Sequence, residues 1–188
     1  IPLTVAGGLR TLEDIRKVLR AGADKVALNT AAIQRPEFVK EAALRFGSST
    51  IMVSIEAIEL SPGKYEAYTD NGRESTGVDA VEWAQRAAEL GAGEIMVTAI
   101  DREGTGRGYD LELTRQVATS VSIPVIASGG LASIADIVRM KMPDAARLEG
   151  AISGRALYDG RIDPAEALGI LNGTLAVEPA QFEQDDRS

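Results

Sequence analysis

The chain has 188 residues, enough for one domain with a sizeable hydrophobic core, and its net charge of −8 argues against binding to nucleic acid or to an anionic membrane surface. It contains no cysteine and no histidine, which excludes disulfides, thiolate chemistry, Ser-His-Asp catalysis and most zinc sites. We therefore expect no bound metal and no cofactor. The side chains left for proton transfer are carboxylates, lysine and tyrosine.

Strand and helix patterns alternate from the first residues onward. Short apolar runs bounded by turns are typical of buried parallel strands, and they occur at 2–6, 25–29, 51–57, 94–100, 123–127 and 148–153. Amphipathic segments predict helices at 11–21, 36–46, 78–90, 110–120, 133–141 and 164–172. Two of these helices begin with variants of the capping box, Thr11 with Asp14 and Ser133 with Asp136.

Two segments depart from the alternation. The polar, turn-rich stretch 58–77 predicts a small hairpin inserted between a strand and its helix. The tail 173–188 ends in a charge-rich run, so we expect it to be disordered and the domain to occupy residues 1–172. No apolar run approaches the roughly 20 residues that span a bilayer, and we expect a cytoplasmic protein.

Six strand–helix units predict a parallel sheet covered by helices, either an open doubly wound sheet or most of a (β/α)8 barrel. An internal repeat favours the barrel. The run VAGGL (residues 5–9) matches ASGGL (127–131), and each copy follows a strand pattern and precedes a helix pattern. Four strand–helix units separate the copies, which is half of an eight-unit barrel. We therefore expect a truncated (β/α)8 barrel that contains strands 3 to 8.

The glycine pairs predict two phosphate-binding cradles. A turn of two glycines between a strand and a helix leaves backbone N–H groups at a helix N-terminus, which suits a phosphate. With polar residues from neighbouring strand ends, the first cradle comprises Gly7, Gly8, Asn29 and Thr30, and the second comprises Gly104, Gly129, Gly130, Ser153 and Gly154. The alternative is that the glycines only make tight turns. The repeat favours phosphate binding, above all at the second cradle, because barrels usually hold phosphate after strands 7 and 8.

Glu56 is the candidate catalytic residue. It closes a very apolar run, where partial desolvation would raise its pKa and suit acid–base catalysis. The alternative is a structural carboxylate held by lysine or arginine. Thr98 lies near the end of the next predicted strand, 94–100, and Asp101 follows that strand; both are candidate substrate contacts, although an ordinary loop fits the segment 101–106 equally well.

Asp24 and Lys25 open a predicted strand and therefore lie at the opposite face of the barrel. The default role of that face is stability or a subunit contact.

Much of the chain, over roughly residues 1–130, resembles the cyclase subunit of imidazole glycerol phosphate synthase, in histidine biosynthesis. The matching segments are AGADKV (21–26), NTAA (29–32), GR (72–73), TGVDAVEW (76–83), GAGEI (91–95), DREGT (101–105) and GYDLELT (108–114). The segment 148–168 instead resembles the sister enzyme, the phosphoribosylformimino-carboxamide ribotide isomerase. Both families have a duplicated barrel and bind long bisphosphorylated substrates, so the chain resembles a hybrid.

The resemblance to the cyclase implies a bisphosphorylated ribotide as substrate and ammonia from a glutaminase subunit, with imidazole ring closure and lyase cleavage. It implies that Glu56 is an acid–base group, where the family has aspartate, while the family's second catalytic aspartate lies on strand 1, outside the strands expected here. It places Glu103 beside the second phosphate. It also places Asp24 and Lys25 at the face where ammonia enters and the glutaminase docks.

Two other functions stay open. The isomerase would carry out an Amadori-type rearrangement without ammonia. A catalytically inactive bisphosphate-binding fragment would bind without turnover. We also expect self-association, because a truncated barrel leaves sheet edges and apolar surface uncovered.

Overall fold

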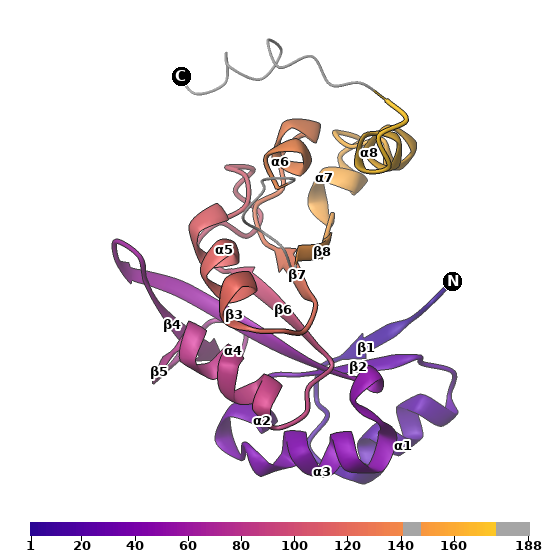
Figure 1. Ribbon diagram of the computed structural model, residues 1–188, viewed down its shortest axis with the longest axis vertical. Helices are drawn as coiled ribbons and strands as arrows, with labels where there is room; N and C mark the ends of the chain where they lie inside the picture. The colour runs from indigo at the N-terminus through magenta and orange to yellow at the C-terminus, as the bar shows by residue number, and fades with distance from the viewer. Residues whose placement is uncertain (141–147, 176–188) are drawn as a thin grey trace.

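Strands and helices alternate in the computed structural model, which describes residues 1–140 and 148–175 (Figure 1). The strands are β1 (Thr4–Ala6), β2 (Lys25–Leu28), β3 (Ile51–Ser61), β4 (Lys64–Thr69), β5 (Glu74–Asp79), β6 (Glu94–Ala99), β7 (Val125–Ser128) and β8 (Leu148–Ala151). The helices are α1 (Leu12–Arg20), α2 (Thr30–Gln34), α3 (Glu37–Phe46), η1 (Ser48–Thr50), α4 (Ala80–Glu89), α5 (Leu111–Ser120), α6 (Ile134–Arg139), α7 (Arg155–Tyr158) and α8 (Pro164–Leu171).

Six of the strands form a parallel sheet in the order β1-β2-β3-β6-β7-β8, and β4 and β5 extend it through an antiparallel pairing with β3. The sheet curls, and helices pack along its outside, with α1 against β2, α4 against β3 and α5 against β7. Over residues 1–140 and 148–175, β1 and β8 are the two edges. This arrangement confirms the predicted fold class, a truncated (β/α)8 barrel.

β3 runs four residues beyond the predicted end at residue 57. Its first part pairs in parallel with β2 and β6, and its second part pairs with β4 as the outgoing arm of the predicted hairpin. The pairings overlap at Glu56, which lies opposite both Tyr68 of β4 and Thr98 of β6. The second part of β3 is more polar than the first, so the sequence pattern did not predict that the strand continues. It is more polar because it pairs with a hairpin strand and is not buried within the parallel sheet.

The short helices α2 and α7 were not predicted, because four or five residues are too few to show helical periodicity. Their N-cap residues, Asn29 and Gly154, have closely similar backbone ψ angles of −92° and −97°. These caps extend the internal repeat to a second pair of equivalent positions, Asn29 and Gly154.

The main hydrophobic core lies between the sheet and the outer helices. Along β3, Val53, Ile55 and Ala57 are buried in this core. Because alternate residues of a strand point to opposite faces, Ser54 and Glu56 point to the inner face of the curled sheet. A second, smaller cluster joins α6, α7 and α8 to β7.

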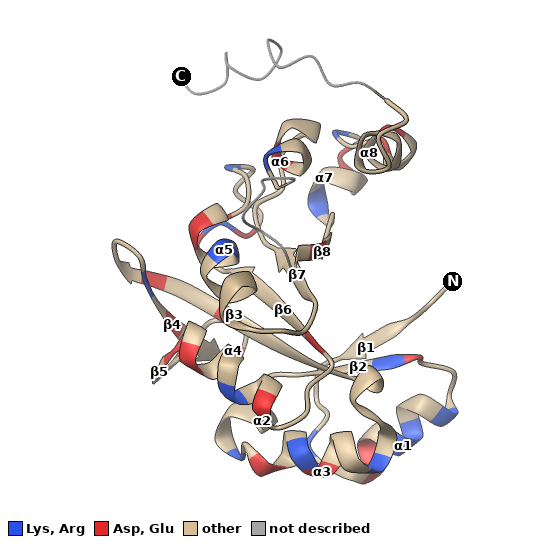
Figure 2. Ribbon diagram, in the orientation of Figure 1, with Lys and Arg blue, Asp and Glu red and all other residues tan. Residues whose placement is uncertain are grey.

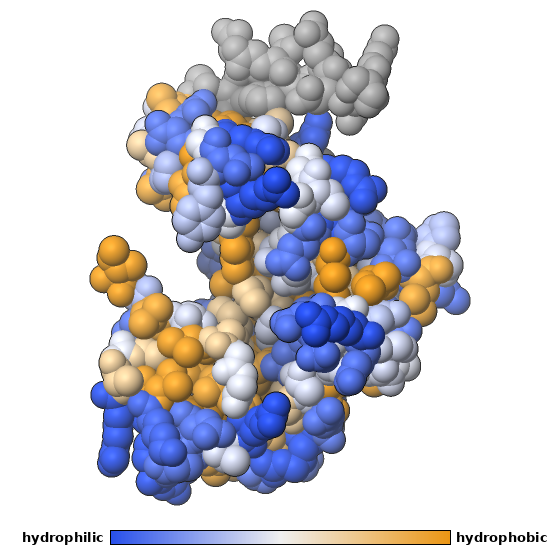
Figure 3. Space-filling view, turned by 180° about the vertical axis from the view of Figure 1, so that it is seen from behind, coloured by the Kyte–Doolittle hydropathy of each residue, from blue (hydrophilic) through white to orange (hydrophobic). Residues whose placement is uncertain are grey.

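The outer helices carry both signs of charge interspersed, as Figure 2 shows along α1, α3 and α4. From behind, Figure 3 shows hydrophobic side chains beside the N-terminal strands and again over the C-terminal part. None of the helices in the described part of the chain is long and apolar enough to cross a membrane.

At the C-terminus, residues 173–175 fold back on α8, where the N–H groups of Thr174 and Leu175 donate to the Gly169 carbonyl. The rest of the tail predicted to be disordered, residues 176–188, lies outside the described residues, as does position 141 of the predicted helix 133–141.

Candidate functional site

The larger candidate site is a cavity of about 780 Å³ at the carboxyl ends of β1, β2 and β3. Residues of the first predicted cradle line it together with Glu56 and the β4–β5 turn: Gly7, Gly8, Arg10, Asn29, Thr30, Arg35, Ser54, Glu56, Asp70, Asn71 and Met96 are among the lining residues. The structure therefore brings together the first cradle and the candidate catalytic carboxylate.

The first glycine pair faces open space. Gly7 and Gly8 have φ angles of 92° and 70°, and a Cβ atom added to either would meet nothing within 4 Å. Glycine here is therefore required by the backbone conformation alone. The helix that follows begins with a reciprocal capping box, in which the Asp14 N–H donates to Thr11 Oγ1 and the Thr11 N–H donates to Asp14 Oδ2.

A smaller cavity of about 280 Å³ lies at the carboxyl ends of β6, β7 and β8. Its lining includes most of the second predicted cradle and two arginines: Glu103, Gly104, Ser128, Gly129, Gly130, Gly154, Arg155 and Arg161. Since parallel strands present their carboxyl ends at the same edge of a sheet, the two cavities open on the same rim.

The second glycine pair is tightly packed. A Cβ atom on Gly129 would lie 2.6 Å from the Ala99 carbonyl oxygen, and one on Gly130 would lie 2.3 Å from the Gly108 carbonyl oxygen. The Gly108 N–H donates to the Gly130 carbonyl at 2.8 Å. Close backbone approach thus requires these glycines whether or not a phosphate binds.

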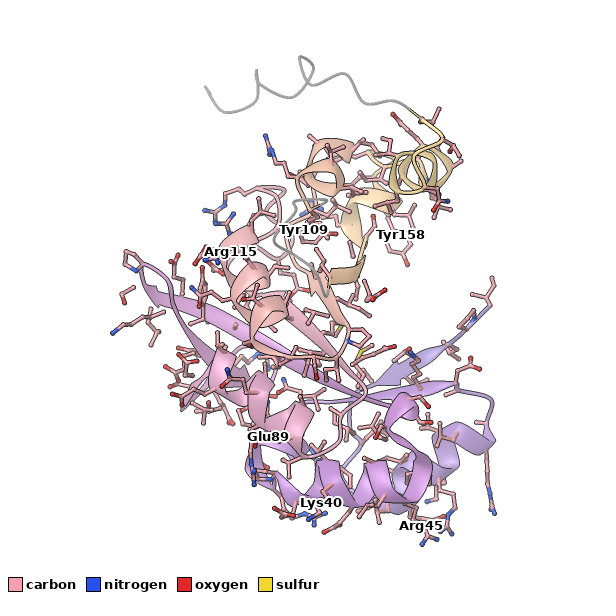
Figure 4. All side chains as sticks on the ribbon, viewed as in Figure 1. Lys40, Arg45, Glu89, Tyr109, Arg115 and Tyr158 are labelled. Atoms are coloured by element: carbon pink, nitrogen blue, oxygen red, sulfur yellow. The ribbon has the colours of Figure 1, made fainter. Side chains whose placement is uncertain are left out.

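Ser153 does not line either cavity. Its Oγ atom is buried and has no hydrogen-bond partner among the residues that the structure describes. Beside it, the Tyr109 hydroxyl donates to the Ile152 carbonyl at 2.8 Å, and burial raises the pKa of Tyr109 well above its usual range. Tyr109, labelled in Figure 4, therefore ties the segment before α5 to the end of β8.

Glu56 combines partial burial with a backbone hydrogen bond. Its Oε2 atom accepts the N–H of Gly72 at 2.8 Å. Burial raises the pKa of Glu56 above its ordinary value, and the hydrogen bonds from Gly72 and Asn29 oppose this shift. The pKa thus moves in the direction that suits acid–base work near neutral pH.

Thr98 and Asp101 lie outside the linings of both cavities. Thr98 is buried on β6, in register with Glu56 on one side and Ser128 on the other. Asp101 is exposed, and its carbonyl accepts a hydrogen bond from Arg107. Their roles as substrate contacts stay predictions.

Four arginines that line the cavities were not among the predicted site residues. They are Arg10 and Arg35 at the larger cavity and Arg155 and Arg161 at the smaller one. Two of them had a signal in the sequence, because Arg10 follows the first glycine pair and Arg155 follows Ser153-Gly154 directly. Guanidinium groups are well suited to hold phosphate, so both cavities have a cation within their lining.

Asp24 and Lys25 lie at the start of β2, away from both cavities. The Asp24 carboxylate accepts the Leu3 N–H at 2.7 Å, and the Lys25 ammonium forms an ion pair with Glu94 at the start of β6. Lys25 also pairs with Thr4 in the sheet, and Glu94 pairs with Met52. The ion pair therefore spans the strands at the opposite face, where the sequence placed it.

The site contains groups for anion binding and for one proton transfer. Within the described ranges, no three acidic side chains stand close enough to hold a metal ion. Glycine turns and arginines are groups that can bind an anion, and a carboxylate such as Glu56 is a group that can transfer a proton.

One comparison identifies the family of the chain. A family model described as "Histidine biosynthesis protein" matches residues 1–163. Since this match covers most of the chain, the protein belongs to the histidine biosynthesis protein family.

Proposed function

We propose that this chain carries out the cyclase reaction of histidine biosynthesis, in which ammonia closes an imidazole ring on a bisphosphorylated ribotide that is then cleaved. Family membership supports a role in histidine biosynthesis. The observation that carries the finer proposal is Glu56, a carboxylate with a raised pKa in the wall of the cavity that holds the first glycine pair. Such a group can exchange a proton with the closing ring.

The two cavities support a substrate with two phosphates. Each lies at carboxyl strand ends, and each is lined by a glycine pair and by arginine. A ribotide that reached from one cavity to the other would pass the inner face of β3 and β6, where Glu56 and Thr98 lie in register. Its two phosphates would thus position the reacting atoms by Glu56.

The resemblance to the cyclase implies ammonia as the second substrate, entering at the face where Lys25 and Glu94 form their ion pair. This ion pair lies at the amino ends of the strands, opposite the cavities. An ammonia source such as a glutaminase subunit would dock at this face, and ammonia would travel along the inside of the sheet. The isomerase needs no ammonia, so docking of an ammonia source at this face would favour the cyclase.

The ribotide isomerase is the second candidate. The segment that resembles the isomerase contains Gly154 and α7, and it forms one wall of the smaller cavity. Its reaction needs the same two phosphate sites, so the requirement for ammonium distinguishes the two activities.

The test is a calorimetric titration of the full chain with the cyclase's bisphosphorylated substrate, followed by turnover with and without ammonium. Arg155→Met should weaken binding about tenfold or more, because it removes a charge-assisted contact to phosphate. The matched control is Arg45→Met on the exposed end of α3, which should leave the affinity unchanged.

Saturable binding with ammonium-dependent ring closure would support the cyclase. Isomerisation of the precursor without ammonium would support the isomerase in its place. Absence of binding, or equal binding by the two arginine variants, would contradict the assignment of the smaller cavity to phosphate.

A further inference from the structure

The turn between β4 and β5 has an uncommon backbone. Asp70, Asn71 and Gly72 have φ angles of 53°, 56° and 76°, and the Arg73 N–H closes the turn on the Thr69 carbonyl at 3.1 Å. Left-handed conformations are disfavoured for residues with a Cβ atom, although Asp and Asn tolerate them best. Such a turn persists only where its surroundings hold it in place.

The surroundings hold this turn on both sides. At the base of β5, the Glu66 carboxylate accepts the N–H groups of Thr76 and Gly77 at 2.9 and 2.8 Å, and it also accepts the Ser75 hydroxyl. These hydrogen bonds fix β5 against β4. At the other side, the turn rests on the side chain of Ile100, just after β6.

The contact with Ile100 leaves room only for glycine at position 72. A Cβ atom there would lie 2.7 Å from Ile100 Cδ1 and 2.8 Å from Cγ2. Any other residue would therefore move either Ile100 or the turn, besides straining a φ of 76°.

The result of this packing is a fixed donor beside Glu56. The Gly72 N–H lies 2.8 Å from Glu56 Oε2. Glu56 is paired with Tyr68, in the strand that leads directly into the turn, so the donor and the carboxylate are carried by one hairpin. Glu56 and the turn residues Asp70 and Asn71 line the larger cavity, and Gly72 contacts this wall through its hydrogen bond to Glu56.

We propose that Gly72 is a positioning residue, whose backbone N–H holds the Glu56 carboxylate in the orientation needed for proton transfer. The proposal rests on the proposed function for its catalytic meaning. It also explains why the side chain at position 56 needs the length of glutamate. An aspartate at position 56 would end about 1.5 Å nearer the strand, one C–C bond shorter, and would lose the 2.8 Å contact to Gly72.

The sharpest test removes the N–H without adding a side chain. Incorporation of glycolic acid at position 72 replaces the Asn71–Gly72 amide by an ester in the otherwise full-length chain. The readouts are the titration of Glu56 by carboxyl ¹³C NMR, assigned with Glu56→Gln, and the pH profile of kcat and KM. Ile100→Val is the control, since it trims the packing but keeps the donor.

The ester should move the titration midpoint of Glu56 upward, because the lost hydrogen bond favoured the charged form. It should lower kcat about 10- to 100-fold with little change in KM, as expected for a displaced catalytic group. Glu56→Asp should lower kcat in the same way, and Ile100→Val should leave the midpoint in place.

An unchanged midpoint and kcat in the ester variant would overturn the proposal. Failure of the proposed function gives a different pattern. A wild-type chain that turns over no ribotide would refute the cyclase assignment, while an ester-dependent midpoint in that same chain would still support the positioning of the carboxylate.

Discussion

Glu56 is a partly buried carboxylate in the wall of the larger cavity, and the hydrogen bond that it accepts from the Gly72 N–H holds it there. Its position at the end of an apolar run predicted a partly desolvated carboxylate at the rim, and burial does raise its pKa. The hydrogen bond from Gly72 could not be predicted, because it depends on how a four-residue turn folds back on Ile100. Arginines such as Arg161 were missed for a similar reason, since their cavity is assembled from distant segments.

The raised pKa of Glu56 has a consequence for stability. Burial makes the folded chain bind this proton more tightly than the unfolded chain does, so the contribution of Glu56 is most favourable at low pH and declines as the pH rises through its titration. Glu56→Gln removes that decline. We expect the variant to have a higher Tm than the wild type at pH 8 and the same Tm near pH 4.

Thermal unfolding followed by circular dichroism at the two pH values measures this difference. Gln retains an oxygen that can accept the Gly72 N–H, so the comparison isolates the charge. A variant that is less stable than the wild type at pH 8 would show that the carboxylate is stabilised by its partners and not desolvated.

Among the strands and helices, the internal repeat is present in the structure as well as in the sequence. Both glycine pairs adopt positive φ angles, and both are followed by a capping box, made by Thr11 and Asp14 at the start of α1 and by Ser133 and Asp136 at the start of α6. The repeat could be predicted because turns and caps are local. The different packing of the two copies could not, because it depends on Ala99 and Gly108, which approach the second copy only.

The two caps should differ in their contribution to stability. Asp136 is 5% exposed and accepts the N–H groups of Ala132 and Ser133 at 2.9 and 3.0 Å, whereas Asp14 is more exposed. Asp136→Ala leaves these two part-buried donors without their partner, at a cost of about 1–3 kcal/mol. Asp14→Ala should cost less, because water can replace its carboxylate.

Urea unfolding of the matched pair measures the two free energies. Equal losses would mean that the second cap is accessible to water in solution, and would count against the packing described around Gly108.

For the molecule as a whole, the alternation of strands and helices predicted the class of fold. The sequence did not predict which hydrophobic side chains stay exposed on its surface. Large hydrophobic side chains are exposed around the C-terminal helices: Ile152, Leu157, Tyr158, Leu168 and Leu171. Tyr158, which is 89% exposed, projects from α7 in Figure 4. This cluster lies near β8, whose outer side is an edge of the described sheet.

We expect the chain to self-associate through this region, because exposed apolar surface and an unpaired strand edge both favour pairing. Leu168→Gln combined with Tyr158→Ser should weaken the association. The control is Leu44→Gln on α3, which replaces a side chain of similar exposure at a distant helix.

Sedimentation velocity over a range of concentrations measures the effect. A single monomeric species at every concentration would contradict self-association, and equal weakening by the control would place the contact elsewhere.

The double pairing of β3 also bears on the order in which the molecule assembles. The contact of β3 with β4 closes a short loop, whereas its contact with β6 joins segments far apart in the chain. Local contacts cost less chain entropy and form sooner during folding. Glu56, Tyr68 and the turn to Gly72 therefore belong to the piece that can form first, so the carboxylate proposed to transfer a proton is in place before the parallel strands assemble around it.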